Sequence, residues 1–440
     1  MDTQRIAKSP ATRRRYSGAA LLTVGALALT ACVGGGGGGG DDASAEARGE
    51  ITIWYSNNEN EVAWGKQMVE AWNAENPDEQ VTAQEIPAGD SSEEVIGAAI
   101  TAGNAPCLIY NTAPAAVGQF EKQGGLVNLS DFEDGASFIE ERSGDTAEQY
   151  QNADGDYFQM PWKSNPVVIF YNKDLFAEAG LDPENPKLAT YDEFLETSRT
   201  LVEAGVAPNA ILPAPTSEFY QSLFDFYPMY AAQSGGTGLV EDGEATFANE
   251  DGYAVADFWA TMYEEGLSAK EAYQGDSFAD GEAAMATVGP WAVSVYDGVN
   301  WGSVPVPTAD GIAAEETYTF SDAKNVGLYT ACENKATAWD VLKFSVGEEQ
   351  DGQLLELTGQ MPLRTDLSGT FPEYFEANPA YEAFGDQASR TIEVPAGPNT
   401  VQMLQTFRDA WSQSVIFGEG DVHDALDEAA AEINDLAAQQ

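Results

Sequence analysis

Short β-rich runs alternate with helical segments along most of the chain. The run from Ile51 to Tyr55 is rich in β-branched and aromatic residues, and the helical pattern that follows it stops at Asn76-Pro77. Further on, Ser91 and Glu94 have the spacing of a capping box that opens a second helix. Because repeated strand-helix units pair their strands in parallel, the sequence predicts an α/β fold with mainly parallel, doubly wound sheets.

The length and the charge of the chain limit what it can bind. Its 440 residues, 43% of them hydrophobic, are enough for two or three domains. Asp and Glu number 72 against 20 Lys and Arg, so the formal net charge is -52. A surface this negative repels phosphate backbones and anionic lipid headgroups, which argues against nucleic acid as a partner. It also leads us to expect a saline habitat, where salt shortens the reach of self-repulsion.

The N-terminal segment has the layout of a secretory signal. Arg13 to Arg15 precede an apolar run from Ala19 to Leu29, which is too short to span a bilayer as a permanent helix. We therefore expect residues 1–31 to be a signal peptide. The arginines fit both a twin-arginine signal and a general basic region, so the export route stays open.

A cysteine and a glycine run follow this signal directly. Leu29-Thr30-Ala31-Cys32 resembles the bacterial lipobox, in which the cysteine is acylated and becomes the mature N-terminus. The alternative is an ordinary signal with a cysteine there by chance. Since Gly34 to Gly40 are typical of a flexible tether, we predict that residues 32–45 hold the protein at the extracytoplasmic face of the membrane through lipid on Cys32.

Residues suited to catalysis or metal binding are scarce. The chain has one histidine and three cysteines, the residue types on which most catalytic triads and zinc sites depend. The sequence therefore predicts no metal, no cofactor and no catalytic residue. With Cys32 assigned to lipid, Cys107 and Cys332 remain in a compartment where disulfides persist, and the sequence fits a bridge as well as two buried thiols.

Several segments match the landmarks of one protein family in the expected order. They begin with Gly124 to Leu129 (GGLVNL), Val168 to Phe176 (VIFYNKDLF) and Tyr191 to Phe194 (YDEF). Phe278 to Trp291 (FADGEAAMATVGPW) resembles the pattern F-x-x-G-x-A-A-M-x-x-x-G-P-W, and Gly359 to Arg364 (GQMPLR) resembles G-x-x-P-x-R. On these motifs the chain resembles bacterial extracellular solute-binding protein family 1, the carbohydrate-type, maltose-binding-protein-like receptors of ABC importers.

The resemblance implies two α/β lobes joined by a hinge, with ligand bound in the cleft between the lobes. We expect the chain to cross the hinge near 163–166, 298–303 and 347–352. The lobes would then comprise 46–162 with 301–348, and 163–300 with 349–440. The family further implies a monomer that closes on a carbohydrate and delivers it to an ABC importer permease in the membrane. One departure is Cys107, where the family usually has aspartate.

Sugars have apolar C–H faces that aromatic rings cover, and hydroxyls that carboxylates and amides can bind. Asn58 and Glu59 follow the first strand and are candidates for binding hydroxyls, or they only cap the next helix. Asn111 follows a later strand by the same logic. Trp162 lies at the first crossing, where it stacks on ligand or packs the hinge, and Asn165 lies just beyond it.

The remaining candidates come from the second half of the chain. Trp291 follows Gly-Pro at a turn, and the matching family position commonly stacks on sugar. Tyr220 and Tyr227 lie in an aromatic-rich stretch, where core packing is the alternative. Arg364 is a candidate to donate to hydroxyls or a carboxylate, or else it pairs with an acidic residue at the surface.

Two classes of function fit these observations. The first is a binding receptor for a carbohydrate, in which closure of the lobes gives affinity and no bond changes. The second is an extracellular glycan-acting enzyme with two catalytic carboxylates. A receptor of the same fold for a polyol, glycerol phosphate or peptide is a third reading. Recovery of intact ligand separates receptor from enzyme, and the identity of the ligand separates the two kinds of receptor.

Overall fold

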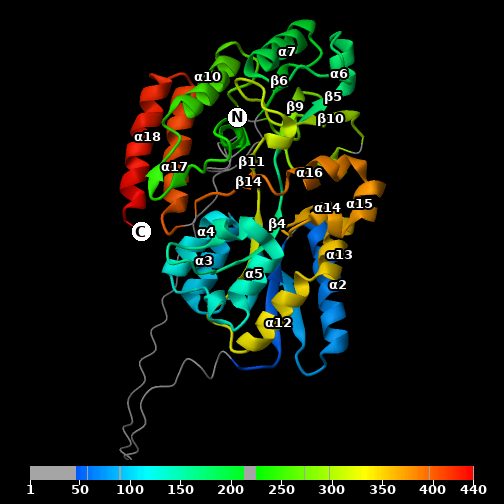
Figure 1. Ribbon diagram of the computed structural model, residues 1–440, viewed down its shortest axis with the longest axis vertical. Coiled ribbons are helices and arrows are strands. Elements are labelled where there is room, and N and C mark those ends of the chain that lie inside the picture. The colour runs from blue at the N-terminus through cyan, green and yellow to red at the C-terminus, as the bar shows by residue number, and fades with distance from the viewer. Residues whose placement is uncertain are drawn as a thin grey trace, which may run out of the picture. The chain divides into compact units, whose positions relative to one another are not determined.

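The computed structural model describes residues 46–439 apart from 57, 89–90, 213–223, 272, 297 and 396. The compact unit Asp41–Gln440 contains two large sheets (Figure 1). In the described part of the chain, no helix is both long and apolar enough to span a bilayer. The predicted signal, Cys32, the glycine tether and Tyr220 lie outside the described residues.

The first sheet has six strands in the order β13-β4-β12-β3-β1-β2. They are β1 (Ile51–Tyr55), β2 (Val81–Glu85), β3 (Leu108–Thr112), β4 (Met160–Ser164), β12 (Lys324–Leu328) and β13 (Met361–Pro362). β1 pairs in parallel with β2 and with β3, and the remaining pairs are antiparallel. The parallel strand-helix units expected from the N-terminal pattern are confirmed, while the strands added later make the sheet mixed.

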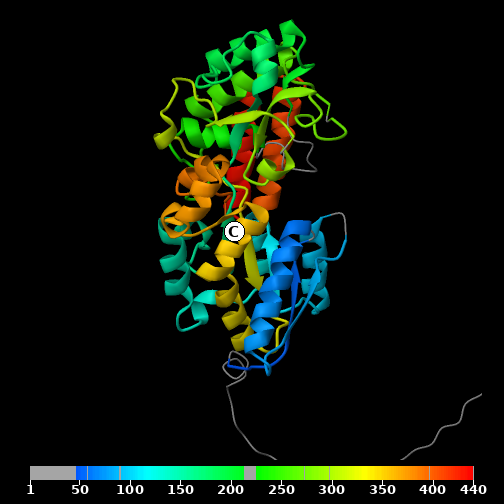
Figure 2. The same cartoon turned by 90° about the vertical axis from the view of Figure 1, so that its right-hand side faces the viewer.

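Helices and the first sheet together form what we call lobe one. Its helices are α2 (Glu59–Glu75), α3 (Ser92–Ala102), α4 (Pro114–Lys122), α5 (Gly135–Ser143), α12 (Lys335–Ser345) and α13 (Glu348–Thr358), with the short helices η1 (Leu129–Asp131) and η2 (Gly144–Tyr150). Ser91 caps α3 by accepting the amide of Glu94, as predicted, and Gly103 ends that helix with a φ of 67°. In Figure 2 the yellow helices α12 and α13 lie beside the blue α2.

The second sheet has four strands in the order β10-β5-β9-β6. They are β5 (Val168–Asn172), β6 (Asn209–Ile211), β9 (Ala283–Val288) and β10 (Trp301–Val304). Only β6 and β9 pair in parallel within this sheet. Its helices are α6 (Lys173–Glu178), α7 (Tyr191–Ala204), α9 (Tyr227–Gln233), α10 (Glu250–Glu264), α11 (Ala292–Val295), α17 (Thr400–Ala410), the π-helix η5 (Trp411–Ile416) and α18 (Val422–Ala437). We call this assembly lobe two; Figure 1 shows α7, α10 and α18 grouped around it.

Smaller elements connect the two lobes or extend lobe two. They are the pair β11 (Thr319–Phe320) and β14 (Thr391–Ile392), the hairpin β7 (Val240–Glu241) and β8 (Glu244–Ala245), and the helices η3 (Ala314–Glu316), α14 (Leu367–Thr370), α15 (Pro372–Ala377), η4 (Pro379–Tyr381) and α16 (Glu382–Gln387). β11 and β14 pair in parallel, and Phe320 belongs to the core of lobe two.

The strand pairing moves two of the three predicted crossings. The chain passes from β4 of the first sheet to β5 of the second between Ser164 and Val168. β10 pairs with β5 of lobe two, so the chain enters lobe one between Phe320 and Lys324 and not near 298–303. Trp64 on α2 donates to the carbonyl of Gln350 on α13, and β13 pairs with β4, so the return lies beyond Pro362 and not near 347–352. The resemblance places the crossings only approximately, because the sheet that a strand joins depends on its pairing partner.

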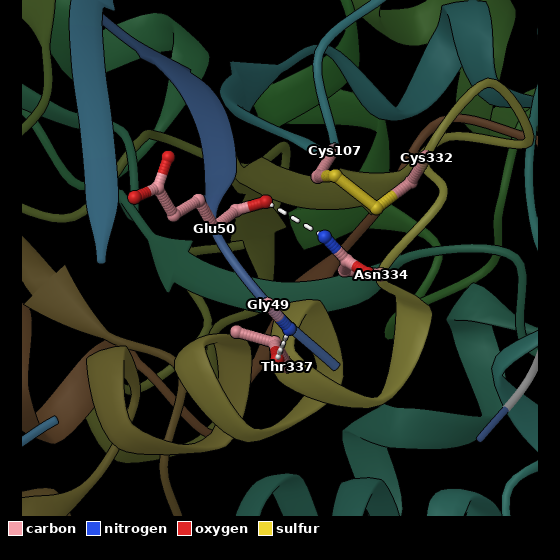
Figure 3. Close-up of a disulfide and its surroundings, with 6 residues drawn as sticks. All are labelled: Gly49, Glu50, Cys107, Cys332, Asn334 and Thr337. Carbon is pink, nitrogen blue, oxygen red and sulfur yellow. Dashed lines mark hydrogen bonds between the residues drawn. A yellow bond between two sulfur atoms is a disulfide. The ribbon is translucent and has the colours of Figure 1, made fainter. Parts of the chain in front are cut away.

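A disulfide joins Cys107 to Cys332, which settles the alternative that the sequence left open. The two residues lie next to the antiparallel strands β3 and β12, in which Leu108 is opposite Leu328. Figure 3 shows that the segment leading into β1 lies beside this disulfide. Asn334 Nδ2 donates to the carbonyl of Glu50 at 2.8 Å, and the amide of Gly49 donates to Thr337 Oγ1 at 3.1 Å.

Candidate functional site

A buried ion pair lies where α2 meets the hinge strand β4. Lys163 Nζ is 2.5 Å from Glu61 Oε1, and both side chains are at most 5% exposed. Gln360 Nε2 donates to the same carboxylate oxygen at 2.7 Å. Burial acts to raise the pKa of Glu61, but the Lys163 ammonium and the hydrogen bonds to the carboxylate outweigh it, so the pKa lies below its usual value. The pair therefore stays ionised and fixes the hinge end of β4 to α2.

Asn165 extends this polar cluster to the second crossing. Its Nδ2 donates to Gln360 Oε1 at 3.2 Å and to the carbonyl of Asp322 at 3.1 Å, and its amide donates to Ser321 Oγ at 3.1 Å. Beside it, Lys324 pairs with the Asp322 carboxylate at 2.5 Å. Asn165 Oδ1 is buried and has no hydrogen-bond partner among the described residues. One acceptor at the hinge is therefore left for another group.

Asn58 and Asn111 meet at Ser56, just past the carboxyl end of β1. The amide of Asn58 donates to Ser56 Oγ at 3.0 Å, and Asn111 Nδ2 lies 3.5 Å from the same oxygen. Asn58 caps α2 by accepting the amides of Asn60 and Glu61, so the capping alternative is confirmed and sugar binding stays a prediction. The side chain of Glu59 lies outside the described part of the structure.

The backbone of Asn111 is in the left-handed region, with a φ of 62°. Asparagine tolerates this conformation better than most residues, and such conformations occur often at binding sites. The strained backbone is the strongest sign that the position of this amide matters.

Trp162 is packed in the core of lobe one. It is 1% exposed, and its ring centroid lies 5.0 Å from that of Trp64 and 5.4 Å from that of Tyr110. Lys163 Nζ lies 4.6 Å from the centroid of the Trp162 ring. The preferred prediction of stacking on ligand is therefore corrected to the alternative of hinge packing.

Tyr227 and Arg364 are also held by other parts of the protein. Tyr227 is fully buried in lobe two, where its hydroxyl donates to the carbonyl of Glu393. Arg364 Nε donates to Asp351 Oδ2 at 3.0 Å, and that carboxylate is buried, not at the surface. Neither side chain is open to a sugar in this arrangement, because one fills the core and the other neutralises an internal acid.

Asp351 has a second and more buried partner, Arg142, which the sequence did not reveal. The Arg142 guanidinium lies 2.9 Å from Asp351, and both side chains are at most 3% exposed. It also donates to the carbonyls of Val346, Pro161, Leu363 and Trp162. Arg142 thereby ties α5 to β4, α13 and the segment after β13. An arginine in an acidic helical segment has no sequence pattern that would mark this role.

Trp291 starts α11 in lobe two and is half-buried. Its ring lies edge-on to Phe224, with centroids 6.2 Å apart, and Phe224 lies 6.0 Å from Phe320, next to Ser321. The rings of Trp291, Phe224 and Phe320 thus form a continuous row in lobe two that ends beside the hinge cluster containing Asn165. Among the predicted residues, the structure links Asn58, Asn111 and Asn165 through Ser56, Glu61 and Gln360, and it brings aromatic rings to the same hinge.

The lobes touch along a seam formed by α4 and η2 on lobe one and by residues 391–398 on lobe two. A Cβ on Gly118 would lie 2.1 Å from the carbonyl carbon of Gly397, so the backbones meet there without side chains between them. Gln149 on η2 donates to the carbonyl of Thr391 at 3.1 Å and accepts the amide of Glu393 at 2.9 Å. Cavities of about 430 and 790 Å³ lie along this seam.

Among the charged side chains that line these two seam cavities, acidic ones predominate. The carboxylates are Glu121, Glu148, Asp154, Glu241, Asp242 and Glu393, and the cation is Lys122. Among the residues that the structure describes, no group of His, Cys, Asp and Glu is placed to hold a metal ion. The motif GQMPLR could have pointed to Gln360, whereas nothing in the sequence pattern marks Glu61 or Glu393.

Two α/β lobes that meet at a polar hinge define the class of two-lobed periplasmic binding proteins. The chain belongs to the family of bacterial extracellular solute-binding proteins, whose model matches residues 56–352. Its relatives include the diacetylchitobiose binding protein DasA of Streptomyces coelicolor, 24% identical over 94% of this chain and 96% of that protein. Another is the sn-glycerol-3-phosphate-binding periplasmic protein UgpB of Rhizobium meliloti, 25% identical over 64% of this chain and 68% of that protein.

A similar fold is found among solved structures. The cyclic alpha-maltosyl-1,6-maltose binding protein of Arthrobacter globiformis has a TM-score of 0.76 and 23% identity, covering 89% of this chain and 100% of that chain. At this identity the likeness shows the two-lobed fold alone. The two-lobed α/β fold is confirmed, although its two large sheets are mixed and not mainly parallel as predicted. The family is the one that the motifs indicated.

Proposed function

We propose that this protein is a lipid-anchored, extracytoplasmic receptor that captures a carbohydrate between its lobes and delivers it to an ABC importer permease. The observation that carries the proposal is the set of amide and hydroxyl groups of Ser56, Asn111 and Asn165 at the hinge, together with the aromatic group of lobe two that runs from Trp291 through Phe224 to Phe320. Amides bind sugar hydroxyls by directional hydrogen bonds, and an aromatic face covers the C–H surface of the ring. The sugars named for DasA and for the Arthrobacter protein are consistent with this class of ligand.

Binding in this proposal depends on closure of the hinge. Asn165 has an unused buried acceptor, and the backbone of Asn111 holds its amide against Ser56. Trp291 belongs to the opposite lobe, so a sugar held by all three would contact both lobes at once. Such a ligand favours the closed form by its extra contacts in that form.

The charge along the seam favours a neutral ligand over a phosphorylated one. Five carboxylates besides Glu393 line the two seam cavities against a single cation, Lys122, and they would repel a phosphate group. Glycerol phosphate, bound by the Rhizobium relative according to its name, is therefore a poorer candidate here than an uncharged sugar.

The test is thermal unfolding of the full chain against mono- and oligosaccharides, with polyols, glycerol phosphate and peptides as controls. A sugar at 100 times its Kd should add about 2.7 kcal/mol to the free energy of unfolding and raise the Tm by a few degrees. Trp291→Ala should remove the shift. The matched control is Trp301→Ala, another half-buried tryptophan, which is stacked on Phe170. A shift with glycerol phosphate alone, or breakdown of the sugar, would reject the carbohydrate receptor.

The anchor is tested separately. Cys32→Ser should release the protein from the membrane fraction and abolish the acylated N-terminal peptide in mass spectra. A membrane-bound Cys32→Ser variant would contradict lipidation, without bearing on sugar binding.

A further inference from the structure

Glu393 is a buried carboxyl at the seam between the lobes. Its residue is 6% exposed, and neither carboxyl oxygen has a hydrogen-bond partner among the described residues. Its backbone is held by lobe one, because its amide donates to Gln149. The next residue, Val394, belongs to the core of lobe two, while Tyr150 on η2 belongs to the core of lobe one. Glu393 therefore lies between two surfaces that separate when the lobes open.

The groups that face this carboxyl come from four elements. They are Glu148 and Tyr150 of η2, Ser321, Asp322 and Lys324 of the second crossing, Tyr227 of α9, and Glu241 and Asp242 of the β7-β8 hairpin. Lys324, the cation of this set, is bound to Asp322 at 2.5 Å. No ion pair within 4 Å of Glu393 is found in the described part of the chain.

Burial raises the pKa of Glu393 to about 8, although the hydroxyls of Tyr150 and Ser321 and the charge of Lys324 act in the opposite direction. In an open form the same carboxyl would face water, where a glutamate has a pKa of about 4.3. The arrangement described here, with the lobes in contact along the seam, therefore holds a proton on Glu393 over a pH range in which an open form has lost it.

We propose that closure of the lobes takes up a proton at Glu393, so that the receptor closes on its ligand more readily as the pH falls. The inference rests on the proposed function, and it adds a regulation of the same binding event. Between the two pKa values each unit of rising pH lowers the equilibrium constant for closure about tenfold, because closure takes up one proton and the proton concentration falls tenfold. Closure is most favourable below the open-form pKa, and it loses this contribution fully once the pH exceeds about 8.

The experiment measures the Kd of the sugar found by the unfolding panel, using the full chain at several pH values from about 5.5 to 8.5. The wild type should bind about tenfold more weakly per pH unit up to about pH 7.5 and then level off. Glu393→Gln keeps the shape of the neutral acid, so its Kd should match the low-pH value of the wild type and stay constant. The control Glu148→Gln removes an exposed carboxylate from the same cavity and should keep the wild-type slope.

Two further measurements test the proposal without the variant or without a sugar. Calorimetry of wild-type binding near pH 6.5, in buffers of different ionisation enthalpy, should show uptake of close to one proton. Small-angle scattering of the chain without ligand should show a more compact population at low pH than at high pH. A constant wild-type Kd, a Glu393→Gln variant that keeps the slope, or the absence of proton uptake would overturn the proposal. If no sugar binds but compaction follows pH, the ligand assignment fails and the proton switch stands.

Discussion

At the scale of single residues, Arg142 has the most demanding environment in lobe one. Replacing it with methionine would leave the Asp351 carboxylate buried with only Arg364 beside it, and would free several backbone carbonyls. We expect Arg142→Met to lower the free energy of unfolding by about 3–5 kcal/mol, measured by denaturant titration. The control is Arg199→Met, which removes an exposed pair with Glu265 and should cost at most about 1 kcal/mol. Equal losses in the two variants would contradict the role given to Arg142.

The predicted site residues differ in how far the sequence could define them. Asn165 follows the strand β4 as expected, whereas Asn111 lies within β3 and not beyond its end, because a local pattern locates a strand better than it locates the strand's last residue. Trp162 has the same sequence signature as a stacking residue, yet its ring is buried against Trp64 and Tyr110. Burial of that kind depends on residues that are distant in the sequence, which no local pattern encodes.

At the scale of elements, the contact of α4 with residues 391–398 limits how closely the lobes approach. Gly118→Ala would place a methyl group against the Gly397 backbone, and such overpacking costs about 1–3 kcal/mol. Because this cost falls on the closed form, we expect sugar binding to weaken roughly five- to hundredfold with little change in the Tm of the ligand-free chain. Gly97→Ala on α3 meets only ordinary contacts and should leave the affinity unchanged. Unchanged affinity in Gly118→Ala would show that this contact is not part of closure.

The disulfide is the second feature that belongs to the elements. It joins residues 225 positions apart at neighbouring strands of lobe one. In the chain-entropy model, closing so long a loop destabilises the unfolded chain by roughly 5 kcal/mol. We expect the double variant Cys107→Ser and Cys332→Ser to lose up to this amount in denaturant titration. Reductant should have no effect on that variant, and an unchanged stability would argue against the bridge in solution.

The strand order shows where prediction from sequence ended. Alternating strands and capped helices were sufficient to predict an α/β fold, and the two lobes followed from the family resemblance. The antiparallel strands β12 and β13 and the placement of β10 depend on pairings between distant segments, so two crossings lie elsewhere than the resemblance led us to expect. Pairing partners are a property of the assembled sheet, and short strands with few residues contain little information about them.

At the scale of the whole molecule, the formal charge of -52 predicts a response to salt. Repulsion between carboxylates is relieved by screening, so the Tm should rise as sodium chloride increases from low to high concentration. Sucrose at matched osmolality separates screening from general solvent effects. A Tm that ignores salt, or that rises equally with sucrose, would count against a saline habitat as the reason for the charge.

The start of β1 has a mechanical consequence. Gly49 and Glu50 are fastened to Thr337 and Asn334 next to the disulfide, and β1 lies between β2 and β3 with both pairings parallel. A force on the N-terminal segment therefore acts along the axis of β1. It shears the backbone hydrogen bonds of β1 to β2 and to β3 at the same time. Bonds that share a force resist it far better than bonds that open one after another. A protein held by its N-terminus in moving fluid would keep lobe one folded under drag, while the hinge stays free to open and close.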